Sequence, residues 1–99
     1  MTQYYRIEGW DTPSADVEME YWGNPYPRAT ASAFSSFHVG RVSVEVKDGA
    51  GKVVLSVVLT GDDPVRALET APGEPGTWTV AVSKAATPGR LSFHMVSAL

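Results

Sequence analysis

The sequence predicts an all-β protein, an antiparallel two-sheet β-sandwich of the jelly-roll or Ig-like type with seven or eight strands. One observation is a hairpin pattern, in which Val42, Val44 and Val46 alternate with polar residues before a Gly-rich turn at residues 48–51. A second is that similar segments recur about every ten residues, separated by Gly, Pro, Asp or Asn. No segment has the spacing and length of an ordinary helix.

The composition limits the classes of protein that remain. The 99 residues are expected to form one domain, residues 1–99, and no apolar run is long enough for a membrane-spanning helix. The net charge is −3 and the basic residues are scattered, so nucleic-acid binding is not expected. The absence of Cys excludes disulfides and thiolate metal sites. The first six residues lack a secretory signal pattern, so a cytoplasmic location is expected if Met1 is the native start.

The first predicted strand spans residues 3–8. Alternation places Tyr5 and Ile7 on its inner face and Tyr4 on its outer face. The Gly, Asp, Pro and Ser residues that follow end the strand, because these residue types favour turns.

The second predicted strand, residues 16–22, alternates strictly between apolar and acidic side chains. The apolar set is expected to face the core: Val17, Met19 and Tyr21. The acidic set is expected to face solvent: Asp16, Glu18 and Glu20. With Asp62 and Asp63, these carboxylates could bind Ca²⁺ or act as general acid and base. The simpler interpretation is a solvated face whose charges pair across strands and deter edge-to-edge aggregation.

The third predicted strand follows a loop. Residues 23–27 contain two prolines, which remove backbone donors and favour a loop. Residues 28–39 form a less regular strand. Phe34 and Phe37 cannot share one face of a regular strand, so a bulge or bend is expected at residues 35–36.

The remaining strands begin with the second half of the hairpin. That strand is expected to turn Val53, Leu55, Val57 and Leu59 to the core. Residues 65–71 are predicted as a short edge strand in preference to one helical turn. The last two strands, residues 77–83 and 90–97, are expected to bury Trp78, Val80, Val82, Leu91, Phe93 and Met95.

Residues 76–82, with the sequence GTWTVAV, follow a Pro/Gly turn and precede a final strand. This pattern resembles the closing strands of bacterial β-sandwich modules such as the pre-peptidase C-terminal and related adhesion-type domains, from Val39 onward. The resemblance implies a β-sandwich architecture. Modules of this kind commonly help the binding, assembly or solubility of larger secreted proteins.

The two histidines occur in similar strings. His38 and His94 each follow a Phe and are expected on an outer sheet face, opposite to that Phe. On neighbouring strands they could join Asp or Glu in a divalent metal site, which typically needs three or four ligands. Because no ligand spacing accompanies them, they are interpreted as ordinary surface or half-buried residues, and neither a metal nor another cofactor is predicted.

Aromatic residues are concentrated in the first 26 positions: Tyr4, Tyr5, Trp10, Tyr21, Trp22 and Tyr26. Tyr5 and Tyr21 fit the predicted inner faces. The other four, Tyr4, Trp10, Trp22 and Tyr26, fall on the opposite phase or in loops and are the candidate binding residues. Exposed rigid rings anchor protein interfaces and also stack on sugars. Alternatively, such rings fold over the open edge of a small sandwich.

The sequence therefore predicts a small non-enzymatic binding or structural module that acts through contacts with a protein partner or with itself. It contains no Gly-x-Ser-x-Gly motif, no Cys nucleophile and no phosphate-binding loop. The expected mechanism is burial of the N-terminal rings against a partner that also completes an exposed strand edge. One alternative is a carbohydrate-binding module that uses exposed aromatics, Asn24 and acidic side chains. Another is a small hydrolase or metal-binding protein that uses surface carboxylates and His.

Overall fold

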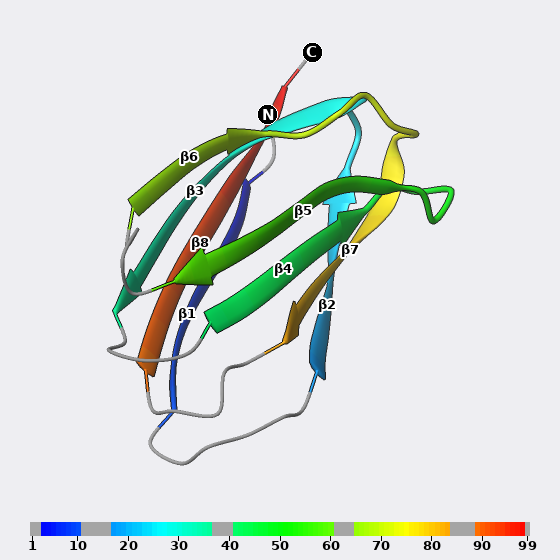
Figure 1. The fold of residues 1–99 in the computed structure, drawn as a ribbon. Coiled ribbons are helices and arrows are strands. Elements are labelled where there is room, and N and C mark those ends of the chain that lie inside the picture. Colours follow the sequence, from blue (N-terminus) through cyan, green and yellow to red (C-terminus); the bar gives the residue numbers. More distant parts are fainter. Residues whose placement is uncertain (1–2, 11–16, 37–40, 61–64, 84–88, 99) are drawn as a thin grey trace.

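The computed structural model describes residues 3–10, 17–36, 41–60, 65–83 and 89–98, which form eight β-strands (Figure 1). The strands are β1 (Gln3–Trp10), β2 (Val17–Asn24), β3 (Arg28–Ser36), β4 (Arg41–Lys47), β5 (Val53–Thr60), β6 (Val65–Glu69), β7 (Gly76–Ser83) and β8 (Gly89–Ala98). Within these ranges there is no helix of the length and apolarity needed to cross a membrane.

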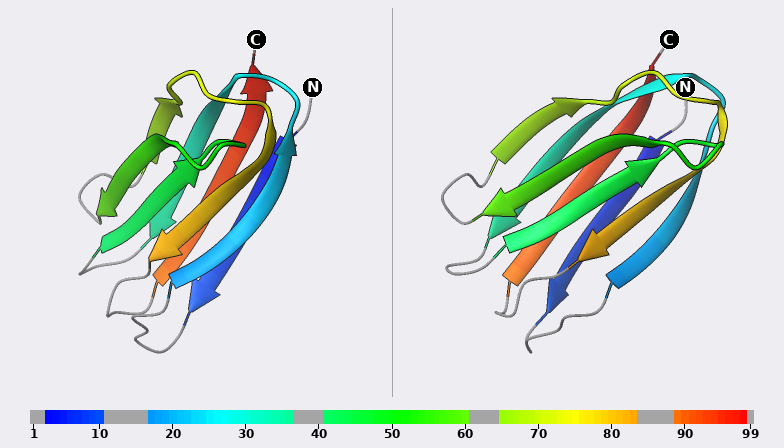
Figure 2. Two further views of the ribbon diagram at one scale, coloured as in Figure 1. Left: turned by 90° about the vertical axis from the view of Figure 1, so that its right-hand side faces the viewer. Right: turned by 45° about the vertical axis from the view of Figure 1, so that its right-hand side comes forward.

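The strands make two four-stranded antiparallel sheets that face each other (Figure 2). Sheet A has the order β1-β8-β3-β6, and sheet B has the order β2-β7-β4-β5. The chain pairs β1 with β8, β2 with β7, β3 with β6 and β4 with β5. A long antiparallel hairpin folded over on itself in this way is a jelly roll. The predicted two-sheet sandwich is thus confirmed, and its topology is the jelly-roll alternative.

The core lies between the two sheets and is built by the strands whose periodicity is clearest. Among its most deeply buried side chains are Val42, Val44, Val46, Trp78, Val80, Val82, Leu91, Phe93 and Met95. Full burial of a large apolar side chain contributes roughly 1.5–3 kcal/mol relative to exposure. The predicted inner faces of β4, β7 and β8 are therefore confirmed.

The faces predicted for Tyr4 and Tyr5 of β1, and for the described residues of β2, are wrong, because both strands are turned over at these positions. The side chain of Ile7 lies outside the described part of the structure. In β1, Tyr4 is 8% exposed and Tyr5 is 62% exposed. In β2, Trp22 is 6% exposed and Tyr21 is 70% exposed. The reason is tertiary: Trp22 lies directly opposite Trp78 in the register of β2 and β7, and Trp78 belongs to the core. Alternation then carries the acidic residues of β2 inward and its apolar residues outward.

A register shift in the hairpin changes which valine of β5 is buried. Val46 pairs with Leu55 but Lys47 pairs with Val53, so Val54 is an extra residue on β5. This β-bulge turns Val54 into the core and leaves Val53 exposed. The prediction for Val53 is wrong, whereas Leu55, Val57 and Leu59 face inward as predicted.

Strand β3 is more regular than its sequence indicated. It pairs with β8 through residues 35–36 without a register shift, so the bulge predicted there is wrong. Small inward residues, Ala29, Ala31 and Ala33, set the buried face, and Phe34 lies on the exposed one. Phe37 lies outside the described residues. The short edge strand predicted at residues 65–71 is confirmed as β6, which spans Val65–Glu69.

Asp48 ties the hairpin turn to the segment between β6 and β7. Its Oδ1 accepts hydrogen bonds from the backbone N–H groups of Ala50 at 2.9 Å and Lys52 at 2.8 Å, and its Oδ2 accepts one from Glu74 at 2.8 Å. These bonds, that of Glu74 foremost, hold the pKa of Asp48 below its usual 3.8. A Cβ at Gly73 would approach Asp48 to 2.7 Å, so the segment can pass this close only with Gly there.

Candidate functional site

The four predicted binding aromatics do not form one exposed surface. Tyr4 and Trp22 are buried, so the expectation that they lie on an outer face is wrong. Tyr26 is half-buried in the turn between β2 and β3. Trp10 ends β1 opposite Gly89, and its side chain lies outside the described part of the structure. A binding role for Trp10 and Tyr26 stays a prediction.

The buried aromatics join the two sheets at the β1/β2 side of the sandwich. Trp22 meets Trp78 edge-on, with ring centroids 5.9 Å apart, and lies 6.4 Å from Tyr4. Tyr4 in turn packs on Phe93, with centroids 6.4 Å apart. Such pairs contribute about 0.5–1.5 kcal/mol beyond the area that they bury. Of the interpretations offered for this aromatic-rich segment, rings that cover the edge of the sandwich describe Tyr4 and Trp22 best.

The acidic residues of β2 also lie on a different face from the one predicted. Glu18 and Glu20 are half-buried and share the inner side of β2 with Trp22. The Tyr4 hydroxyl donates a hydrogen bond to Glu20 Oε2, which connects the edge strands of the two sheets. Asp16 and residues 62–63 lie outside the described residues. An acidic solvent face on β2 is therefore wrong for Glu18 and Glu20.

Asn24, named for the carbohydrate alternative, is the buried last residue of β2. Its Oδ1 accepts a hydrogen bond from the backbone N–H of Tyr26 at 3.0 Å, and its Nδ2 donates to the carbonyl oxygen of Arg28 at 3.3 Å. With 1% of its surface exposed, Asn24 holds the loop between β2 and β3 and is shielded from a ligand in solvent.

The inversion of β2 leaves three large apolar side chains in solvent. Val17, Met19 and Tyr21, here called the β2 stripe, are 57%, 53% and 70% exposed. They follow one another along the outer face of a strand that lies at the edge of sheet B. Solvent-facing positions of an edge strand ordinarily carry polar or charged side chains. The β2 stripe is therefore unusual for an edge strand, and it is the candidate interaction surface of the protein.

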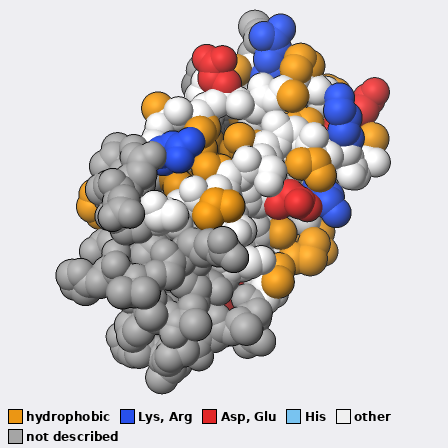
Figure 3. Space-filling view, in the orientation of Figure 1, with side chains coloured by type: hydrophobic (Ala, Val, Ile, Leu, Met, Phe, Trp, Pro, Cys, Tyr) orange, Lys and Arg blue, Asp and Glu red, His pale blue; other side chains and the backbone are white. Residues whose placement is uncertain are grey.

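On the rest of the outer face of sheet B, the two middle strands carry small or charged side chains, and the other edge strand, β5, carries apolar ones again. Three rows cross it: Val17-Ser83-Ser43-Val58, Met19-Ala81-Glu45-Ser56 and Tyr21-Thr79-Lys47-Val53. Val53 and Val58 of β5 are exposed, while Lys47 Nζ lies 3.8 Å from Glu45 Oε1 on β4. On the side of the molecule seen in Figure 3, hydrophobic side chains likewise lie between isolated charged ones.

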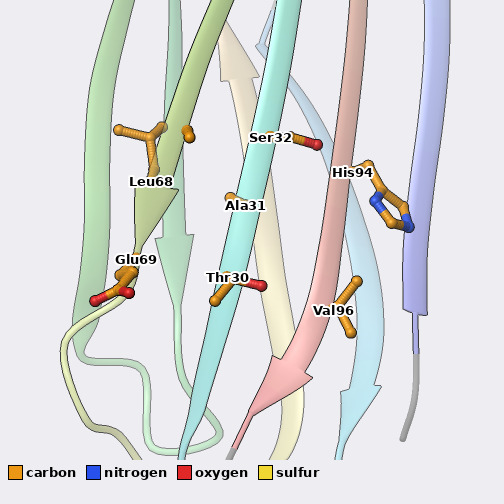
Figure 4. Close-up of a pocket in the computed structure, with 8 residues that line it drawn as sticks. Thr30, Ala31, Ser32, Leu68, Glu69, His94 and Val96 are labelled. Carbon is orange, nitrogen blue, oxygen red and sulfur yellow. The ribbon is translucent and has the colours of Figure 1, made fainter.

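The outer face of sheet A carries a shallow hollow of about 490 Å³ (Figure 4). Its lining comes from β3, β6 and β8: Thr30, Ala31, Ser32, Ala67, Leu68, Glu69, His94 and Val96. His94 is half-buried on this outer face, opposite to Phe93, as predicted. The exposed ring of Tyr5 meets His94 edge-on, with centroids 5.5 Å apart. The hollow thus offers hydroxyls, an imidazole and a carboxylate beside an exposed aromatic ring.

The described residues offer no cluster of three or more His, Asp or Glu side chains that could hold a metal ion. His38, the second residue of the proposed metal pair, lies outside the described residues. The structure therefore does not test the alternative in which both histidines bind a metal.

The β2 stripe was missed because an exposed apolar set on an edge strand has the same period as a core face. One signal in the sequence could have found it. Trp22 is the largest side chain of β2 and lies on the same face as Glu18 and Glu20. Giving Trp22 more weight than the smaller apolar residues would have predicted the buried face of β2 correctly.

Comparisons with known proteins give a fold and no family. No family model matches the chain, and no curated protein matches it. A chain from a solved structure described as "Bacillus endospore appendages form a novel family of disulfide-linked pili" superposes with a TM-score of 0.59 at 18% identity, covering 95% of this chain and 82% of the other. At this identity the likeness shows the shared β-sandwich. The resemblance to pre-peptidase C-terminal domains is supported only at the level of the sandwich architecture and otherwise stays a prediction.

Proposed function

We propose that this protein is a non-enzymatic structural module that associates with further copies of itself. The observation that carries the proposal is the β2 stripe. Val17, Met19 and Tyr21 present a continuous apolar line on a strand that has β7 as its one neighbour among the described strands. The hydrogen-bonding groups along the open side of such a strand are ready to pair with another chain.

Burial of the β2 stripe supplies the driving force for association. Each of these side chains contributes on the order of 1.5–3 kcal/mol when it moves from full exposure to full burial, and somewhat less from its half-exposed starting point. Three neighbouring side chains of this kind offset part of the entropy lost when two proteins associate. An exposed apolar patch on a small protein commonly marks an interaction surface.

The likeness to a chain of the Bacillus endospore appendages supports the same function at the level of fold. Those appendages are described as disulfide-linked pili. The present chain contains no Cys, so assembly of its copies rests on packing and strand pairing without covalent links. A structural role also agrees with the absence of a catalytic motif from the sequence.

Charge on the β2 stripe tests this function. We expect Met19→Glu to shift the protein towards monomer in sedimentation velocity experiments, because a carboxylate in the contact must be desolvated. Ala71→Glu adds the same charge at an exposed position between β6 and β7 and is the matched control, expected to assemble like the wild type. Assembly of the Met19→Glu variant at wild-type concentrations would count against the β2 stripe.

A carbohydrate-binding module is the second candidate function, and the hollow on sheet A favours it. Tyr5 supplies an exposed ring beside the hollow, and Thr30, Ser32 and Glu69 supply groups that bond sugar hydroxyls. We expect binding on a glycan array that Tyr5→Ala abolishes if this function holds. An array without binding, together with self-association of the wild type, leaves the structural module as the function.

A further inference from the structure

The two edges of sheet B fit each other, and from this we infer how copies join. We propose that the β2 edge of one copy pairs with the β5 edge of the next, so that sheet B continues from copy to copy. This inference rests on the proposed self-association. It adds the partner surface, the direction of assembly and the type of assembly.

Strand direction makes the two edges compatible. All neighbouring pairs in the order β2-β7-β4-β5 are antiparallel, so β2 and β5 run in opposite directions. A second copy placed beside the first in the same orientation therefore brings its β2 antiparallel to β5. The junction then repeats the pairing found between every other pair of strands in the sheet.

The outward side chains of the two edges also match. The three rows of sheet B begin with the β2 stripe and end at Val58, Ser56 and Val53 of β5. Continuing a row into the next copy sets Val58 near that copy's Val17 and Val53 near its Tyr21. Cross-strand apolar pairs of this kind stabilise a sheet. One contact then brings the exposed apolar residues of the two edges side by side and removes their facing flanks from water.

Charge disfavours the alternative in which β2 pairs with β2 of a second copy. Any antiparallel register that centres the two stripes on each other sets Glu18 or Glu20 opposite a glutamate of the other copy. Like charges directly opposite each other destabilise a strand pair. In contrast, β5 has the sequence VVLSVVLT and carries no charge. Pairing of β5 with β5 avoids the repulsion but leaves the β2 stripe in solvent.

Head-to-tail pairing has a consequence for the size of the assembly. Because the contact uses two different edges, each added copy leaves a free β2 edge at one end and a free β5 edge at the other. Such a heterologous contact produces an open filament unless its rotation closes a ring. Each copy adds four strands, which advances sheet B by about 19 Å at the usual spacing of about 4.8 Å between strands.

Thiol cross-linking can test the pairing without interference from native thiols, because the chain has no Cys of its own. Met19→Cys and Ser56→Cys place single thiols at exposed positions of β2 and β5. After treatment with a short bis-maleimide linker, we expect a covalent dimer when the two variants are mixed and little dimer from either variant alone. The double variant is expected to give a ladder of oligomers. Val17→Cys with Val58→Cys is a second pair that repeats the test in a neighbouring row.

Four results would overturn the inference. Dimers from Met19→Cys alone mean that β2 pairs with β2, and dimers from Ser56→Cys alone mean that β5 pairs with β5. Mixed variants that stay uncross-linked, while the wild type self-associates in sedimentation experiments, place the contact elsewhere and leave the proposed function standing. A wild type that stays monomeric removes both the proposed function and this inference.

Discussion

The indole rings of Trp22 and Trp78 meet edge-on, with centroids 5.9 Å apart and planes at 81°, at directly opposite positions of β2 and β7. Trp78 is fully buried, and its Nε1 donates a hydrogen bond to the carbonyl oxygen of Glu74 at 2.7 Å. The hydrogen bond and the surrounding core thus hold Trp78 in position, and the ring of Trp22 packs against it. This contact decides which face of β2 is buried and which three side chains are left outside.

Trp22→Ala tests whether this contact supports the fold. Removing a buried indole leaves a cavity, so we expect the free energy of unfolding to fall by about 3–5 kcal/mol. Tyr21→Ala is the matched control one position away, since Tyr21 is exposed and its removal is expected to change stability by less than about 0.5 kcal/mol in the dissociated protein. Urea denaturation measures both. Equal losses for the two variants would mean that β2 is not turned as the structure has it.

The hydrogen bond from Tyr4 to Glu20 links the edge strands of the two sheets. In Tyr4→Phe the ring stays and the hydroxyl is lost, so we expect a loss of about 1 kcal/mol in the free energy of unfolding, because Glu20 is only half-buried. Tyr5→Phe removes the same hydroxyl from the exposed neighbour and is expected to be close to neutral. Thermal or urea unfolding of the two variants distinguishes them, and a larger loss for Tyr5→Phe contradicts the assigned faces of β1.

Asp48 makes the stability of the hairpin depend on pH. Its pKa is lower in the folded protein than the roughly 3.9 of an unfolded Asp, so the unfolded state binds the proton more readily. The contribution of the carboxylate to stability is therefore complete above the unfolded pKa and is lost as the pH falls through the folded pKa. We expect Asp48→Asn to unfold at lower urea concentration than the wild type at neutral pH. The difference should narrow below a pH of about 4. A difference in urea midpoint between the two proteins that stays constant across this pH range would argue against the stabilising hydrogen bonds of Asp48.

Two glycines with different surroundings test how closely the segment between β6 and β7 approaches Asp48. A Cβ at Gly73 would lie 2.7 Å from the Cβ of Asp48 and 2.9 Å from Val54 Cγ1, whereas a Cβ at Gly23 meets nothing within 4 Å. We expect Gly73→Ala to lower the free energy of unfolding by about 1–3 kcal/mol through overcrowding. Gly23→Ala is expected to be neutral or slightly stabilising, because Ala loses less backbone entropy than Gly on folding. The reverse order of the two melting temperatures would contradict this packing.

The sequence was sufficient for the fold class and for the buried faces of β4, β7 and β8. In β4, β7 and β8 the apolar residues occupy one phase and the polar residues the other, so alternation alone identifies the buried face. Each of these strands has a neighbouring strand on both sides, so local pattern and tertiary packing agree. The bulge at Val54 was beyond this reasoning, because a register shift is set by the partner strand.

The buried and exposed faces of the edge strands β1 and β2 were predicted wrongly, and this failure has a physical cause. Alternation says which residues of β2 share a face, but only packing on Trp78 says which face is inside. On β2 the outer face carries Val17, Met19 and Tyr21 and the inner face carries Glu18 and Glu20, the reverse of an ordinary half-buried strand. Departures from local rules of this kind are expected where a protein has a function to perform. The misassigned strand is thus also the candidate surface.

The mass of the wild-type particle, measured by multi-angle light scattering over a range of concentrations, shows whether the protein self-associates. We expect species above the 10.6 kDa chain, with a mean mass that rises with concentration as copies add at the β2 and β5 edges. A particle that stays at 10.6 kDa up to the solubility limit would contradict self-association as the function of this fold.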